Sequence, residues 1–220
     1  MNKKEYIWNF LADLEKNNSK EWMDENRQRY NSAKQYWLDE VASVLKRLSA
    51  HDSSFEQFQP KDIITRINNN RMFHPDKPIY KGHFSCSPAG KADELTKVFF
   101  AFGPEFTMIG GGLYRPDNKA LKSIREAIDF DADGLTKILN DKKLIEVTGG
   151  LAEDENKLKT SPKGYSNDHP HVDLLRYKSF TAQYTPLKKD IINADLATEV
   201  ERVYLAIQPL VNWLQKAISV

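Results

Sequence analysis

The chain has 220 residues, of which 40% are apolar and 29% charged, with a formal net charge of +1. These values are typical of a soluble globular protein, and so balanced a charge argues against binding nucleic acid through bulk electrostatic attraction. Cys86 is the one cysteine, the charged N-terminus is unlike a signal peptide, and no run of about 18 apolar residues predicts a membrane span. We therefore expect a cytoplasmic protein with no membrane partner.

Helical periodicity dominates the N-terminal part of the chain. Apolar residues recur at helical spacing over residues 6–14, and the string Asn-Asn-Ser then interrupts them. Asn18, with Glu21 three residues later, indicates a capping box that starts a second helix of about thirty residues. We expect Trp22 and Trp37 on this helix to be core residues rather than a platform for a ligand.

Short β-rich runs begin near residue 60. Residues 62–68 and 98–102 predict strands, rich in β-branched and aromatic side chains. Residues 106–110 follow a turn formed by Gly103 and Pro104, so they are expected to complete a hairpin with the second of these strands.

Helical periodicity returns after Pro116, in a helix that Asp117 is expected to cap. Residues 131–142 predict another short helix, and LIEVTGG with the polar turn AEDENK predicts a second hairpin. An apolar stripe over residues 196–210 predicts closing helices.

Helices flank a central block of strands in this order, and strands do not alternate with helices. The order predicts an α+β fold with N-terminal helices, a central, mainly antiparallel sheet and C-terminal helices. No low-complexity linker or internal repeat divides the chain, so we expect a single domain over residues 1–220.

Three patterns resemble ligand sites, and each lacks something that the chemistry needs. DFDADG at 129–134 starts like a calcium loop but has Asn140 where the twelfth-position glutamate belongs. DHPHVD at 168–173 has two imidazoles and two carboxylates, but no second ligand cluster. GGG at 110–112 lacks the lysine of a phosphate loop. We interpret DFDADG as the cap of a helix, DHPHVD as a turn, and GGG as a site of close backbone packing. We therefore expect no metal and no cofactor.

The segment RINNNRMFHPDKPIYK, residues 66–81, has the most unusual composition in the chain. It contains four cations and one carboxylate, and two prolines stiffen it. Arginine offers a planar fork for phosphate or carboxylate, lysine a point charge, and tyrosine a hydroxyl with an aromatic face. Similar chemistry recurs after the glycines, in LYRP, and in PKGYSNDHPHVDLLRYKSF.

We predict that these three segments meet in a pocket for a small anionic ligand that bears phosphate or carboxylate. The predicted ligand-binding residues are Arg66, Arg71, Lys77, Tyr80, Lys81, Arg115, Lys163, Tyr165 and Arg176. An alternative stays open, in which Asp76, Asp168 and Asp173 pair with the arginines in a structural network.

The pocket could belong to an enzyme, in which its cations would stabilise developing negative charge. The sequence identifies no catalytic residue, so whether the protein is an enzyme stays undecided. The main alternative is a non-enzymatic interaction or structural module that docks a protein partner through its helices. Binding of nucleic acid ranks last because the charges balance.

Four strings, in order, resemble the uncharacterised domain family DUF 2461 over nearly the whole chain. They are FLADLEKNNSKEWMDENRQRY, RINNNRMFHPDKPIYK, GGGLYRPDNKALKSIREAI and PKGYSNDHPHVDLLRYKSF. In that family an Arg-Ile pair precedes Arg-Asp-x-Arg-Phe and Asp-Lys-x-Pro-Tyr-Lys, and the residues that match are Arg66, Ile67, Phe73, Asp76, Lys77, Tyr80 and Lys81. Asn69 and Asn70 stand where Arg-Asp is usual. The resemblance implies a single α+β domain, and it implies no particular activity.

Overall fold

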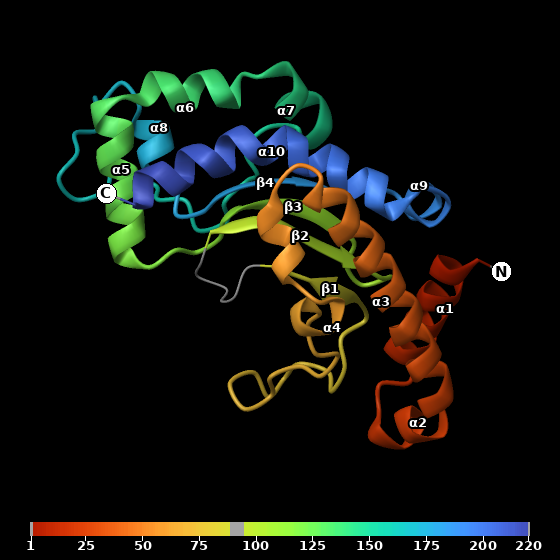
Figure 1. Cartoon of the computed structure of the whole chain (residues 1–220). Helices are drawn as coiled ribbons and strands as arrows, with labels where there is room; N and C mark the ends of the chain where they lie inside the picture. Colours follow the sequence, from red (N-terminus) through yellow and green to blue (C-terminus); the bar gives the residue numbers. More distant parts are fainter. Residues whose placement is uncertain (1, 89–94, 220) are drawn as a thin grey trace. The chain divides into compact units, whose positions relative to one another are not determined.

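The computed structural model describes residues 2–88 and 95–219, which form an α+β protein with N-terminal helices, a four-stranded sheet and C-terminal helices (Figure 1). The predicted fold class is confirmed. Two compact units alternate along the chain. Unit 1 comprises residues 2–88, 99–109 and 185–201, and unit 2 comprises residues 95–98, 110–184 and 202–219. The assignment of a single domain stays a prediction.

Unit 1 begins with the helices α1 (Lys3–Lys16), α2 (Lys20–Glu25) and α3 (Arg27–Ser49). Asn17 closes α1, and the Ser19 hydroxyl caps α2 by accepting a hydrogen bond from the Trp22 backbone N–H at 3.1 Å. The single long helix that the sequence predicts is therefore two helices, which meet at Asn26. The cap was predicted at Asn18, one position too early, and the Asn18 side chain instead makes hydrogen bonds with the backbone of Tyr80.

The core of unit 1 is built around Trp37 on α3. The Trp37 ring stacks on the ring of Phe84, at a centroid distance of 6.2 Å, and on that of Phe102, at 6.3 Å. The centroid of the Phe100 ring lies 5.5 Å from that of Trp37. Aromatic pairs of this kind contribute about 0.5–1.5 kcal/mol each beyond the area that they bury. The prediction that Trp37 is a core residue is confirmed, whereas Trp22 is half-buried.

Four strands form one sheet in the described part of the chain, in the order β1-β2-β3-β4. They are β1 (Phe84–Cys86), β2 (Thr96–Phe102), β3 (Met108–Leu113) and β4 (Phe180–Tyr184). β1 pairs antiparallel with β2, with Ser85 opposite Ala101. β2 and β3 confirm the first predicted hairpin. Gly103, at the start of its turn, packs closely on the segment before β1, because a Cβ on Gly103 would lie 2.4 Å from the carbonyl oxygen of Gly82.

The strand predicted over residues 62–68 is wrong. A short 3-10 helix, η1 (Ser53–Gln57), follows α3, and α4 (Pro60–Ile63) then takes up the start of the predicted strand. Proline at the first position of a helix pre-sets its backbone angle, which favours a helical turn here. The residues after α4 make isolated bridges, one of them between Asn68 and Tyr80.

Unit 2 contains α5 (Asn118–Phe130), α6 (Ala132–Leu139), α7 (Lys142–Thr148) and α8 (Val172–Leu175). Asp117 caps α5, as predicted. The second predicted hairpin is wrong, because its first half is α7. Asp141 caps the start of α7, and Gly149, in the left-handed conformation at φ 78°, ends it.

The apolar stripe predicted over residues 196–210 lies on α10 (Leu196–Ile218), which confirms a helix at the end of the described chain, and α9 (Lys188–Asn193), in unit 1, precedes it. Within residues 2–88 and 95–219, no helix combines the length and the apolar character that a membrane crossing requires.

Candidate functional site

Residues 66–81 form a loop with two arms, beside α4 in Figure 1, which we call the basic hairpin. Backbone hydrogen bonds hold the arms together. The N–H of Lys81 donates to the carbonyl of Ile67 at 2.8 Å, and the N–H of Asn69 donates to that of Ile79 at 2.9 Å. Local antiparallel pairing therefore brings the arms together although neither is a regular strand.

Asn18 fastens the base of the basic hairpin to the N-terminal helices. Its Nδ2 donates to the Tyr80 carbonyl at 2.8 Å, and the Tyr80 N–H donates to its Oδ1 at 2.9 Å. Tyr80 is buried, as is Ile67 on the other arm. Lys81 is half-buried and donates its ammonium to the Arg66 carbonyl at 2.7 Å. The base of the hairpin is thus anchored from both arms.

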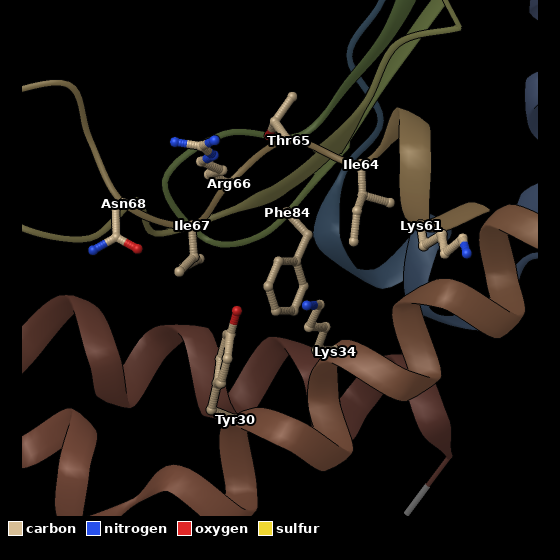
Figure 2. A pocket seen from close by; sticks show the side chains of 9 residues that line it. All are labelled: Tyr30, Lys34, Lys61, Ile64, Thr65, Arg66, Ile67, Asn68 and Phe84. Atoms are coloured by element: carbon tan, nitrogen blue, oxygen red, sulfur yellow. The ribbon is translucent and has the colours of Figure 1, made fainter. Parts of the chain in front are cut away.

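A cleft of about 210 Å³ lies between α3 and the first arm of the basic hairpin (Figure 2). Tyr30 and Lys34, one turn apart on α3, point toward Ile67 and Phe84 on the opposite wall. The cleft is lined by Tyr30, Lys34, Lys61, Ile64, Thr65, Arg66, Ile67, Asn68 and Phe84.

The lining contains three cations, Lys34, Lys61 and Arg66, and no carboxylate. None of the three makes an ion pair with another described residue, whereas Arg29, also on α3, pairs with Asp13 at 2.6 Å. Unbalanced positive charge in a cleft concentrates field lines and attracts anions. The electrostatics of the cleft therefore favour a negatively charged ligand.

The cations occupy two positions in the cleft. Figure 2 shows the charged ends of Lys61 and Arg66 at opposite ends of one wall, directed away from Phe84, while Lys34 and the Tyr30 hydroxyl lie inside. Burial raises the pKa of Tyr30, so its hydroxyl keeps its proton at neutral pH and can donate a hydrogen bond. Lys34 and Tyr30 are therefore the inner donors, and the exposed side chains of Lys61 and Arg66 add positive potential at the mouth.

This arrangement can bind an anion. Beside the inner donors lie Ile67 and Phe84, whose apolar side chains reduce the local dielectric and strengthen charged hydrogen bonds. The lining residues include neither a carboxylate nor an imidazole that would act as a general base.

Five of the predicted ligand-binding residues lie in unit 1. Arg66 lines the cleft, Tyr80 and Lys81 anchor the hairpin, and Arg71 and Lys77 are exposed near its tip. Burial, and then the charge of Lys77, lower the pKa of Lys81. Arg66 is therefore the one residue of these five predicted ligand-binding residues that lines the cleft.

The other four lie in unit 2: Arg115, Lys163, Tyr165 and Arg176. The backbone N–H of Arg115 donates to the Ser179 hydroxyl at 3.0 Å, and Arg176 pairs with Asp173 at 3.2 Å. The pair of Arg176 with Asp173 is one that the alternative hypothesis predicts, in which aspartates pair with the arginines in a structural network. That all nine residues converge on one ligand stays a prediction.

The His169 side chain of DHPHVD serves local structure. The Nε2 atom of His169 lies 3.0 Å from Asp129 Oδ1, and its Nδ1 accepts a hydrogen bond from the His171 N–H at 3.1 Å, so both ring nitrogens are occupied. Asp131, in the DFDADG string, caps α6. In the described residues no group of three or more His, Cys, Asp or Glu side chains could hold a metal ion.

The glycines of the GGG string lie within β3 rather than after it. A Cβ on Gly110 would lie 2.6 Å from the carbonyl oxygen of Ala182, and one on Gly112 would lie 2.2 Å from that of Phe180. Gly112 also has a φ of 116°. These positions are glycine because β4 approaches closely.

Sequence reasoning missed Tyr30, Lys34 and Lys61. Tyr30 and Lys34 are four residues apart on a predicted helix, so a shared face was available as a clue. Lys61 lies in α4, just before the strand predicted over residues 62–68, and only the tertiary structure brings it to the cleft.

The fold and the cleft define an α+β protein with a cationic cleft beside a basic hairpin. The chain matches a family model described as "Conserved hypothetical protein (DUF2461)" over residues 6–213, and it belongs to this family. The resemblance inferred from the four sequence strings is thereby confirmed. Neither the curated proteins nor the solved structures contain a match.

Proposed function

We propose that the protein binds a small anionic ligand, bearing phosphate or carboxylate, in the cleft between α3 and the basic hairpin. The observation that carries the proposal is a lining with three cations and no carboxylate, none of the three being paired with another described residue. Like charges in one cleft repel each other, and a bound anion relieves that repulsion.

The proposed ligand uses the inner and outer groups differently. Its charged group accepts hydrogen bonds from Lys34 and the Tyr30 hydroxyl, while Arg66 and Lys61 swing from the mouth to cover it. The long, exposed side chains of these last two residues can make that movement. The proposed role is binding, in a cytoplasmic protein.

Isothermal titration calorimetry at constant ionic strength tests the proposal, with inorganic phosphate and acetate as probes. Lys34→Met removes the inner cation, and Lys46→Met is the matched control because Lys46 is an exposed lysine on the same helix. A charged hydrogen bond contributes about 1.5–3 kcal/mol, so Lys34→Met is expected to weaken binding by at least about tenfold while the control leaves it unchanged.

Thermal unfolding gives a second readout. A ligand at about a hundred times its dissociation constant stabilises the protein by about 2.7 kcal/mol, or roughly 5–10 °C in a chain of this length. The absence of saturable binding by either probe contradicts the proposal, as does equal affinity in wild type and Lys34→Met.

A further inference from the structure

The tip of the basic hairpin exposes two adjacent large apolar side chains. Met72 is 83% exposed and Phe73 is 73% exposed. Among the exposed large apolar side chains of the described residues, these two are neighbours in sequence and the others are isolated. Adjacent apolar side chains in water gain free energy when an apolar phase covers them. The tip is therefore suited to insertion into such a phase.

Cations flank the apolar pair. Arg71 precedes it, Lys77 follows four residues later, and Arg66 and Lys81 stand at the base of the two arms. Asp76 is the one carboxylate of the hairpin. From tip to base, apolar side chains come first and positive charge follows.

Hydrogen bonds within the tip hold this arrangement. The Arg71 guanidinium donates to the Pro75 carbonyl at 3.2 and 3.3 Å. The backbone N–H of Arg71 donates to the Asn69 carbonyl at 3.1 Å, and that of Lys77 to the His74 carbonyl at 3.2 Å. The tip thus keeps a turn that presents Met72 and Phe73 to solvent, and little ordering entropy is lost on docking.

We propose that the tip of the basic hairpin docks on an anionic lipid bilayer. Met72 and Phe73 insert at the boundary between headgroups and acyl chains, and Arg71 and Lys77 lie among the headgroup phosphates. Peripheral segments insert about 5–10 Å in this way, a depth that a two-residue tip can reach. The lack of an apolar span led us to expect no membrane partner, but docking on a bilayer surface needs no span, so this proposal departs from that expectation. The docking is also independent of the anion-binding cleft.

Two other occupants fit the tip less well. A second copy of the chain would place two positively charged hairpins together. A nucleic acid would use Phe73 for stacking, but Met72 has no aromatic face and the chain as a whole carries a net charge of only +1. An anionic bilayer matches both the apolar pair and the flanking cations.

Co-sedimentation of the full chain with vesicles tests the proposal. Vesicles of phosphatidylcholine are compared with vesicles that also contain about 30% phosphatidylserine, which model an anionic cytoplasmic leaflet. The wild type is expected to bind the second kind and to dissociate as salt is added. Arg71→Gln with Lys77→Gln should lower the affinity by roughly 25-fold, about fivefold for each cation.

Substitution of the apolar pair separates insertion from simple charge attraction. Met72→Ser with Phe73→Ser keeps every charge and is expected to lower the affinity at least about tenfold, because insertion is lost. Phe130→Ser is the matched control. Phe130 is 93% exposed on α5, but Asp129 and Asp131 flank it, so its loss should leave vesicle binding unchanged.

A fluorescent label reports insertion directly. Cys86 is buried, so Phe73→Cys provides a single exposed thiol for an environment-sensitive dye. A blue shift with phosphatidylserine vesicles is expected. The proposal is overturned if the wild type does not bind these vesicles, or if the apolar double variant binds them as well as the wild type does. It is also overturned if the wild type binds an oligonucleotide but not the vesicles, and the tip variants lose that oligonucleotide binding.

Discussion

The Asn18 side chain allows a sharp test of how the basic hairpin is held. Its amide makes two hydrogen bonds to the backbone of Tyr80, which is 62 positions away in sequence. Asn18→Ala removes both bonds without adding bulk. The Tyr80 N–H and carbonyl, on a residue that is only 7% exposed, then lose their partners.

The expected loss of stability follows from these bonds. A typical hydrogen bond contributes a net 0.5–1.5 kcal/mol, and a buried group left without a partner costs about 1–3 kcal/mol. Water reaches part of this site once the side chain is truncated, so we expect a loss of about 2–3 kcal/mol in the free energy of unfolding. For a chain of this length that corresponds to a fall in Tm of roughly 5–10 °C.

Urea unfolding followed by circular dichroism measures the loss, and Asn17→Ala is the control. The Asn17 side chain is exposed and donates to the Asp13 carbonyl within its own helix, so its removal should cost less than about 0.5 kcal/mol. Hydrogen exchange should also become faster at the Lys81 N–H, which pairs the two arms. Equal stability of Asn18→Ala and Asn17→Ala would refute the claim that Asn18 anchors the hairpin.

Two further predictions concern titration. The His51 imidazole, and then the Arg47 guanidinium, hold the pKa of Glu201 below its usual value. The stability from this carboxylate is therefore present above its unfolded-state pKa of about 4.3 and is lost as the pH falls through the lower folded-state pKa. Urea unfolding of Glu201→Gln should show a smaller loss of stability on acidification, and an unchanged pH dependence contradicts this. Burial raises the pKa of the Cys86 thiol, so a disulfide reagent at about pH 8 should modify it quickly only after unfolding; rapid modification of the folded protein contradicts this.

Local chemistry in the sequence was enough to predict many of the helices and one hairpin. Asp117 marked the start of α5, and the turn at Gly103 and Pro104 marked the β2–β3 hairpin, because caps and turns depend on residues close in sequence. The failures arose where two local preferences competed. LIEVTGG has β-branched side chains, but the Asp141 cap and Gly149 fix a helix.

The candidate site was less predictable than the fold. Composition led to the basic hairpin and to Arg66, because uneven charge is visible in a sequence. The inner donors, Tyr30 and Lys34, lie about forty residues earlier on a helix that looks like an ordinary amphipathic one. Their role depends on Phe84 and Ile67 forming the opposite wall, which is a tertiary contact that no local pattern encodes.

The anchoring of the basic hairpin makes its two proposed roles separable by experiment. The base contains buried Ile67 and Tyr80 and is tied to Asn18, so substitutions there should change both stability and the shape of the cleft. The tip is tied mainly to itself, through the Arg71 guanidinium and the Pro75 carbonyl. Substitutions of Met72 and Phe73 should therefore leave the unfolding free energy and the binding of phosphate unchanged. A change in vesicle binding alone then belongs to the tip, and a change in phosphate binding alone belongs to the cleft.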